Sequence, residues 1–483
     1  MTPTLADLAA RLSDTQTAMN IMWTMLAGFL VMFMQAGFAL VETGLTRAKN
    51  VAHTMGMNFF VYAIGIIGFY FVGFGLQMGS VGAMATFGND ATLSAAPAAI
   101  TLFGKSFELF GTSGFMLPAS MFTAPVAAMF FFQMVFMDTT CTIPTGALAE
   151  RWKFTSFVLL TFVISTVIYP VYGMWVWGGG WLADLGVNFG LGHGHVDFAG
   201  SSVVHMTGGV MALSLSRMLG PRIGKYGADG RVNPIPAHDI PQVMVGTFIL
   251  AFGWFGFNAG STLAGMDTQL AVVATNTMLA SATGAFGAFV YTKVRFGKPD
   301  PSWLANGMLA GLVAITAPCA FVDPWAAMLI GLIAGVLVVV AAVFIDTKLR
   351  IDDPVGAGAV HGVNGAFGIV ALGLFANGRY GDGWNGVPGK VTGLLYGDGG
   401  QLAAELIGIA ANVLYVAPVA MLAFWIIGKV VGNRPSADDE VNGLDLPEMG
   451  VLGYAQDALP HLASAPRPQA PAGATAPGLA GQR

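Results

Sequence analysis

Long uninterrupted apolar stretches constrain this chain more than any other feature of its 483 residues. A helix needs roughly 20 apolar residues to cross the hydrocarbon core of a bilayer. We count eleven such stretches, with approximate bounds 20–42, 54–78, 119–145, 155–177, 198–219, 239–260, 269–292, 303–320, 325–347, 356–378 and 401–428. Only 10% of the residues are charged, whereas a soluble domain carries about 25%. The sequence therefore predicts an all-α polytopic membrane protein with eleven transmembrane helices.

The distribution of basic residues indicates an orientation. Lysine and arginine concentrate in the cytoplasmic connections of membrane proteins. An odd number of crossings places the two termini on opposite sides. If the N-terminus is outside, all but four of the 21 lysines and arginines fall in cytoplasmic segments, the exceptions being Arg11, Lys105, Arg379 and Lys390. We therefore predict that the N-terminus is outside and the C-terminus inside.

The ends of the chain differ from its apolar body. Residues 1–19 lack the basic start and cleavage-site pattern of a secretory signal, so we expect them to remain as an extracellular segment. The body is predicted to span residues 20–430. Residues 431–458 are polar and patterned, which is typical of a cytoplasmic tail. Residues 459–483 are rich in alanine and proline and are predicted to be disordered.

Several functional classes receive no support from the composition. Cys141 and Cys319 both lie in apolar stretches and are expected to be small buried side chains rather than a disulfide. The net charge is −5, and no basic cluster indicates nucleic-acid binding. No nucleophile–base constellation or metal cluster stands out beyond one pair of histidines. We therefore predict that the chain is not an enzyme and uses no cofactor or metal.

A repeated pattern occurs in the fifth and tenth apolar stretches. DFAGSSVVHMTGG begins at Asp197, and DPVGAGAVHGVNG begins at Asp353. In both copies the same spacing follows the aspartate: a glycine, then a histidine (His205 and His361), then a further glycine. This predicts two five-helix halves, about 20–220 and 239–378, with the eleventh helix at 401–428 outside the repeat. An odd number of helices per half makes the second half inverted.

The inverted repeat would bring His205 and His361 together near the middle of the bilayer. Ionisable side chains at that depth are costly and commonly mark a functional pathway. The alternatives are two separately satisfied packing histidines, or a chance match in a glycine-rich chain. The other histidines, at positions 53, 193, 195, 238 and 461, fall at the edges of stretches or in loops. No role is predicted for them.

Six short motifs are distributed along the chain: RAKN at 47–50, GALAER at 146–151, WGGG at 177–180, DFAGSSVVH at 197–205, GWFGFNAGS at 253–261 and VHGVNG at 360–365. In this order they resemble the Amt/Mep/Rh ammonium transporter family, closest to its Amt branch, over roughly residues 20–455. The resemblance implies a homotrimer in the cell membrane, in which each subunit has its own pore. It implies transport of ammonium or ammonia in nitrogen metabolism.

The resemblance also implies roles for individual residues. Trp177 and Ser261 would form an outer recruitment site, with Phe132 and Phe136 in its wall. The remaining implied roles are a gate of Phe136 and Phe257, a pore pair of His205 and His361, and supporting positions at Asp197, Tyr169 and Thr316. Taken alone, Trp177 and Phe257 are typical of packing or lipid-facing aromatics, and Asp197 is typical of a helix N-cap.

Elementary chemistry explains why such residues suit ammonium. Ammonium matches potassium in size and charge, so selectivity must use its N–H donors and its ability to lose a proton. A cation over an aromatic ring gains about 0.5–2 kcal/mol, and the Ser261 hydroxyl can accept one N–H bond. An unpaired ion in the hydrocarbon core costs on the order of 20 kcal/mol. Deprotonation to neutral ammonia removes that cost, and metal ions cannot follow. Whether the proton crosses separately stays open.

Other residues leave alternatives open. Asp138 and Glu42 lie inside apolar stretches, where they serve either function or helix packing. The segment EVNGLDLPEMGVLGYAQD resembles the cytoplasmic tail of the family, although Met449 stands where a histidine is common. The resemblance implies that this tail packs under a neighbouring subunit and that PII-type signalling proteins can plug the pore at the cytoplasmic face. A solvated tail is the alternative. Two other functions are considered: an ammonium sensor that conducts weakly or not at all, and a channel for another small neutral gas.

Overall fold

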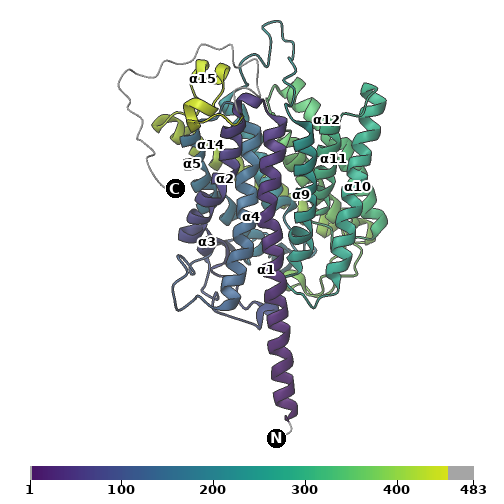
Figure 1. Ribbon diagram of the computed structural model, residues 1–483. Coiled ribbons are helices and arrows are strands. Elements are labelled where there is room, and N and C mark those ends of the chain that lie inside the picture. The colour runs from purple at the N-terminus through teal and green to yellow at the C-terminus, as the bar shows by residue number, and fades with distance from the viewer. Residues whose placement is uncertain (1–2, 455–483) are drawn as a thin grey trace, which may run out of the picture.

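The computed structural model describes residues 3–454. These residues fold into one bundle of long helices (Figure 1). The α-helices are α1 Leu5–Leu45, α2 Val51–Gly68, α3 Phe74–Met78, α4 Ala124–Leu148, α5 Phe154–Val163, α6 Tyr169–Trp177, α7 Leu185–Phe189, α8 Thr207–Leu219, α9 Ile240–Asn258, α10 Gln269–Phe296, α11 Pro301–Ile315, α12 Pro324–Phe344, α13 Asn364–Phe375, α14 Gly399–Val430 and α15 Ala437–Asn442. The π-helical turns are η2 Phe69–Gly73, η4 Ile164–Ile168, η5 Ser201–Met206, η7 Ile345–Leu349, η8 Gly358–Val363 and η11 Asp445–Met449.

Every predicted apolar stretch contains a helix in the structure. In the described part of the chain, nine helices are long and apolar enough to cross a membrane. The other two predicted stretches are residues 198–219, which form η5 and α8, and residues 303–320, which contain the 15-residue α11. The N-terminal end of α1 and the tail helix α15 lie at opposite ends of the bundle (Figure 1). Eleven crossings and their orientation remain predictions.

The first helix is longer than the apolar pattern indicated. α1 begins at Leu5 and runs for 41 residues, because a capping box closes its first turn: Thr4 and Asp7 accept each other's backbone N–H groups. Its first turns project beyond the bundle (Figure 1). The third stretch starts later than expected, since Thr123 caps α4 and residues 119–123 form a turn.

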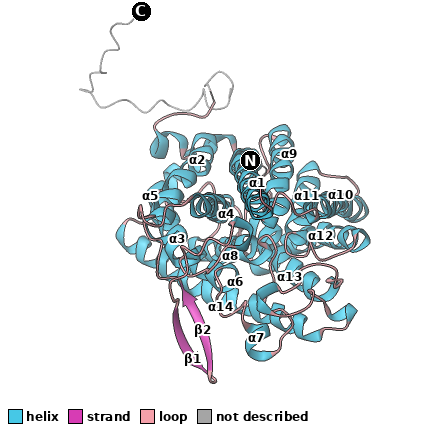
Figure 2. Ribbon diagram, turned by 90° about the horizontal axis from the view of Figure 1, so that it is seen from below, coloured by secondary structure: helices cyan, strands magenta, loops and turns pink. Residues whose placement is uncertain are grey.

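A β-hairpin interrupts the otherwise helical fold. β1 Ala98–Leu102 pairs antiparallel with β2 Lys105–Phe110, and the hairpin projects from one side of the bundle (Figure 2). The two turn residues, Phe103 and Gly104, both have positive φ angles of 55° and 72°. This geometry is typical of the tight turns that match strand twist. A search for stretches of roughly 20 apolar residues cannot detect strands of five and six residues, so the sequence analysis contains no prediction of this hairpin.

Contacts among the helices bring segments of the two predicted halves together. α1 and α9, the first helices of the two halves, pack along each other, and α10 packs against α11 and α12. The two half-helices that begin at η5 and η8 cross at the centre. A Cβ atom added to Gly365 would lie 2.5 Å from the Ser201 carbonyl oxygen and 3.0 Å from the Met206 nitrogen. The matched glycines therefore permit this close crossing.

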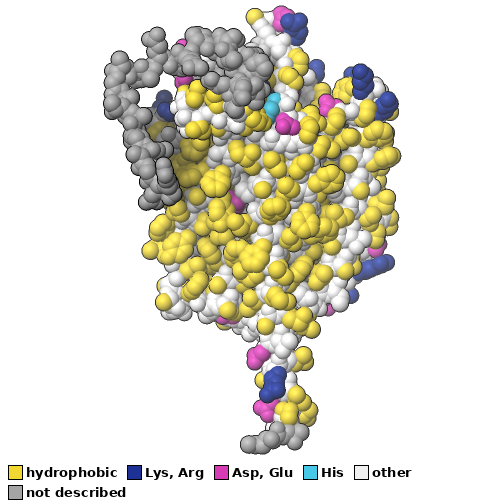
Figure 3. Space-filling view, viewed as in Figure 1, with side chains coloured by type: hydrophobic (Ala, Val, Ile, Leu, Met, Phe, Trp, Pro, Cys, Tyr) yellow, Lys and Arg dark blue, Asp and Glu magenta, His cyan; other side chains and the backbone are white. Residues whose placement is uncertain are grey.

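The lateral surface is apolar. Hydrophobic side chains cover the visible side of the bundle, while lysine, arginine and acidic side chains gather toward its two ends (Figure 3). Large apolar residues on α9 stand exposed, including Phe248 at 65% and Phe252 at 54%. Such a belt fits contact with lipid or with other membrane helices.

Candidate functional site

A cavity of about 170 Å³ lies where α6 and α9 end beside the middle of α4. Its lining includes all four residues predicted for the recruitment site: Trp177 at the end of α6, Ser261 after α9, and Phe132 and Phe136 one turn apart on α4. The ring centroids of Phe132 and Phe136 are 4.6 Å apart. Ser261 donates its hydroxyl proton to the Phe257 carbonyl at 2.8 Å, so its lone pairs are free to accept from a molecule in the cavity.

The cavity also contains residues that the sequence did not single out: Gln133, Phe198, Leu263 and Trp384. Phe198 follows Asp197 inside the DFAGSSVVH motif, so a signal was present. Trp384 comes from the connection between α13 and α14, where glycine and polar residues surround it. No periodicity marks a residue in such a loop, and only the fold brings it to the site.

The floor of the cavity is a pair of stacked rings. Phe136 and Phe257 lie with centroids 4.2 Å apart and planes 22° apart, and both side chains are fully buried. This is the pair predicted as a gate. The ring of His205 follows directly, with its centroid 5.2 Å from that of Phe257.

His205 and His361 meet below the stacked phenylalanines. Their Nδ1 atoms are 3.1 Å apart, and their ring planes differ by 21°. One Nδ1 must therefore donate and the other accept. His205 also stacks on Trp254, whose indole N–H donates to Thr316 at 3.0 Å. Thr316 thus supports the wall of the histidine pair through Trp254.

Two half-helices present these histidines. Asp197 accepts hydrogen bonds from four backbone N–H groups at the start of η5, at 2.7 to 3.0 Å, and Asp353 accepts two at the start of η8. The first glycine in each copy, Gly200 or Gly356, has a positive φ angle that lets the chain turn into the half-helix. Trp177 donates its indole N–H to the Asp197 carbonyl at 2.7 Å, so this cap also fixes a cavity residue.

A path continues beyond His361. A void of about 20 Å³ lies next to His361 and Phe38 and is also lined by Glu42, Asn306 and Val355. Asn306 and Val355 also line a wider vestibule of about 510 Å³ at the opposite end of the bundle from Trp177. Glu42 accepts hydrogen bonds from Asn58 at 2.6 Å and Thr145 at 2.7 Å. Five features therefore follow one another from one end of the bundle to the other. They are the outer cavity, the stacked rings, the histidine pair, the void and the vestibule.

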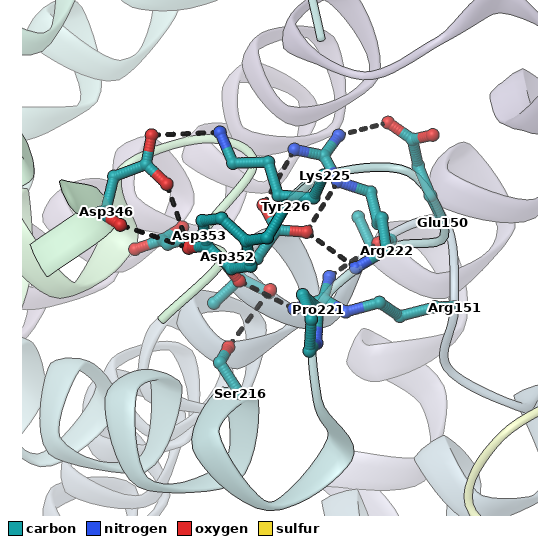
Figure 4. Close-up of polar contacts among 12 residues, drawn as sticks. Glu150, Arg151, Ser216, Pro221, Arg222, Lys225, Tyr226, Asp346, Asp352 and Asp353 are labelled. Carbon is teal, nitrogen blue, oxygen red and sulfur yellow. Dashed lines mark hydrogen bonds and ion pairs between the residues drawn. The ribbon is translucent and has the colours of Figure 1, made fainter. Parts of the chain in front are cut away.

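An ionic network braces the vestibule (Figure 4). Arg222 forms ion pairs with Glu150 at 2.7 Å and with Asp352 at 2.9 Å, and Lys225 pairs with Asp346 at 2.9 Å. Burial alone would raise the pKa of Asp352, but the hydrogen bonds from Arg222 and the charges of Arg151 and Arg222 hold this pKa well below its usual range. Glu150 belongs to the GALAER motif and Asp352 directly precedes the second repeat. The network thus joins the two halves.

Two other predicted residues lie away from the path. Tyr169 is buried behind the cavity, where its hydroxyl lies 3.4 Å from the Gln133 side-chain oxygen. Asp138 is buried in α4, and its Oδ1 atom has no hydrogen-bond partner among residues 3–454. Neither side chain lines the outer cavity or the inner void.

The described part of the tail packs against the same chain. Glu440 forms an ion pair with Arg434 at 2.8 Å, and the Leu444 N–H donates to Asn50 at 2.9 Å. Tyr454 contacts His238 at 2.9 Å. The segment predicted to be disordered, 459–483, lies outside the described residues.

Comparisons with known proteins agree with this architecture. The model of the Ammonium Transporter Family matches residues 22–454. The chain is 43% identical to ammonium transporter Amt2 of Archaeoglobus fulgidus, covering 91% of this chain and 89% of that protein. It is 36% identical to ammonium transporter Amt1 of Haloferax mediterranei, covering 90% and 79%.

Solved structures give the same result. A protein described as a sensor Amt protein superposes with a TM-score of 0.77 at 34% identity, covering 90% of this chain and 99% of that one. Mep2 of Saccharomyces cerevisiae superposes with a TM-score of 0.72 at 27% identity, covering 87% and 88%. Matches of this extent show that this chain belongs to the Ammonium Transporter Family.

Proposed function

We propose that the chain recruits ammonium in the aromatic cavity, removes its proton and passes ammonia along the histidine pair. The observation that carries this proposal is the alignment of Phe136, Phe257, His205 and His361 directly beneath the cavity, with the two imidazoles 3.1 Å apart. The site is small and aromatic, which suits a small cation rather than a large solute.

Recruitment follows from the cavity lining. The faces of Trp177 and the phenylalanines attract a cation by about 0.5–2 kcal/mol, and Ser261 accepts one N–H bond. The Asp197 carboxylate supplies negative potential without lining the cavity. Potassium gains the same attraction to the rings but donates no hydrogen bond.

Passage requires loss of the proton. The Born cost of a bare ion in this buried region is on the order of 20 kcal/mol, which ring contacts do not offset. Neutral ammonia avoids the cost and exchanges hydrogen bonds with the imidazoles. The same rings provide Nδ1 atoms that can relay the proton separately, which would make transport electrogenic.

We further propose that the protein acts as a homotrimer in the cell membrane, with its N-terminus outside. The exposed apolar faces of α1, α9 and α10 support helix contacts between subunits. A PII-type protein is proposed as a partner at the vestibule end, where the tail segment lies.

Uptake of labelled methylammonium into vesicles containing the purified protein tests the function. We expect saturable uptake that responds to an imposed pH gradient and that excess potassium does not inhibit. Inhibition by excess potassium would contradict the proposed selectivity of the recruitment site, and uptake that does not respond to the pH gradient would contradict the deprotonation step.

An ammonium sensor is the second candidate, because a structure described as a sensor Amt protein superposes closely on this chain. A sensor would bind methylammonium without moving it. Absence of uptake by protein that retains binding and a folded thermal transition would favour this role.

A further inference from the structure

A chain of hydrogen bonds connects the eleventh helix, α14, to the outer cavity. The Glu405 carboxylate on α14 lies 2.6 Å from Nδ1 of His195. The other ring nitrogen, Nε2, lies 2.9 Å from the Ser202 hydroxyl, which donates to the Asp197 carboxylate at 2.7 Å. The backbone carbonyl of Asp197 in turn accepts the indole N–H of Trp177 at 2.7 Å. We call the first four residues the Glu405 chain.

Proton counting fixes the direction of these bonds. Ser202 has one hydroxyl proton and donates it to Asp197, so it must accept from a protonated Nε2 of His195. One further proton then lies between Nδ1 and Glu405. The pair is neutral overall whether that proton is on the imidazole or on the carboxylate. An amide in place of Glu405 would preserve the pattern, because its N–H can donate to an unprotonated Nδ1.

The surroundings hold the Glu405 chain in place. Glu405 also accepts from the Val196 N–H at 3.0 Å and from Gln401 at 2.7 Å. Gly408, one turn further along α14, packs against the His195 ring, where an added Cβ would lie 2.6 Å from the ring Cγ. All members are fully or almost fully buried. The ring therefore has a single position.

The second half-helix has no comparable support. Asp353 caps η8, yet among the described residues its carboxylate receives only backbone N–H groups. The extra residues thus occur only on the half-helix that adjoins the outer cavity. Glu405 comes from α14, the helix outside the repeat, whereas His195 precedes η5 and Ser202 lies in its first turn. This support therefore acts on the Asp197 cap, whose backbone carbonyl accepts the indole N–H of Trp177 beside the outer cavity.

We infer that Glu405 and His195 are positioning residues: acting through Ser202, they set the placement of Asp197 and of the Trp177 ring in the recruitment site. The inference deepens the proposed function and rests on it. A wrongly placed ring weakens binding of the cation, while the stacked phenylalanines and pore histidines remain in place. Loss of this support should therefore lower the apparent affinity for the cation and change the maximal rate of uptake less.

The test compares the concentration dependence of methylammonium uptake among matched variants. Because a hydrogen bond to a charged group is lost, we expect Glu405→Ala to raise KM about tenfold with a smaller change in maximal rate. We expect Glu405→Gln to remain within about twofold of the original protein. Leu406→Ala, on the exposed side of the same helix, is the control for insertion and expression.

A second variant protects the test against misfolding of Glu405→Ala. Ser202→Ala removes the link between His195 and Asp197 and should raise KM by a similar factor. In the double variant, Ser202→Ala with Glu405→Ala, the rise in KM should be no larger than in either single variant, because both substitutions interrupt the same chain of hydrogen bonds. Three outcomes would overturn the inference. They are an unchanged KM in both single variants, additive effects on KM in the double variant, and a rise in KM for Glu405→Gln as large as that for Glu405→Ala. Absence of uptake by the original protein would instead overturn the proposed function.

Discussion

Asp138 presents an energetic problem at the scale of a single residue. Its carboxyl group is buried in α4, two residues after Phe136, and its Oδ1 atom lacks a partner within residues 3–454. Burying a polar group without a hydrogen bond costs about 1–3 kcal/mol. No compensating contact for that atom is found in the described residues.

We therefore expect Asp138→Ala to stabilise the protein by about 1–3 kcal/mol, because it removes the unpaired group. Thermal unfolding in detergent, followed by tryptophan fluorescence, measures the change. Methylammonium uptake should stay within about twofold of the original value, since the side chain lines neither cavity nor void. Loss of uptake by a stable Asp138→Ala variant would assign the carboxyl a part in transport.

The crossing of the two half-helices is the critical feature at the scale of elements. Gly209 and Gly365 stand where each half-helix touches the backbone of the other. Added methyl groups would separate η5 from η8 and with them the two imidazoles. The requirement comes from close approach rather than from backbone conformation, because neither glycine has a positive φ angle.

Gly209→Ala and Gly365→Ala are each expected to reduce methylammonium uptake by at least about tenfold, because the two imidazoles would no longer lie next to each other. Gly399→Ala, at the first turn of α14, is the matched control, because an added Cβ there meets only Leu394 at 3.6 Å. Equal uptake by the Gly365→Ala and Gly399→Ala variants would refute the role of the crossing.

The hairpin at the cavity end provides a pH-dependent element. Burial and, to a smaller extent, the nearby carboxylate of Glu108 on β2 together raise the pKa of Asp184, at the start of α7, to about 6. The folded state therefore binds this proton more tightly than the unfolded state does. The associated stability is complete below the ordinary value of 3.8 and is lost as pH rises through about 6.

Hydrogen exchange of residues 98–110 tests this element. We expect faster exchange, corrected for intrinsic rates, at pH 7.5 than at pH 5. Glu108→Gln should reduce the difference because it removes the like charge, while burial preserves part of it. Equal pH dependence in both proteins would show that the two carboxylates do not interact.

At the scale of the whole molecule, the order of apolar stretches predicted the bundle and the repeated motif predicted where its halves meet. Spacing alone placed His205 and His361 together, since the copies share their caps and glycines. Other parts needed three-dimensional contacts. Trp384 reaches the cavity from a loop, and the Glu405 chain joins His195 to Glu405, which lie far apart in the sequence.

The physical reason for these omissions is the same in each case. Periodicity records which side of a helix is buried, and it contains no information on partners brought in by another helix. The sequence predicts no role for His195, because its buried partner lies on α14, far away in the chain. The carboxylate of Glu405 inside an apolar stretch was the available signal, as an intramembrane charge requires a partner.

The most direct test measures transport by protein that carries both His205→Leu and His361→Leu. It asks whether two adjacent imidazoles allow ammonia, but not ions, to cross the buried region. Uptake and ammonium-induced current in vesicles, normalised to folded protein, should both fall at least about tenfold, because the apolar side chains offer no hydrogen bonds. Ammonium-selective uptake and currents unchanged from those of the original protein would contradict this role of the histidine pair.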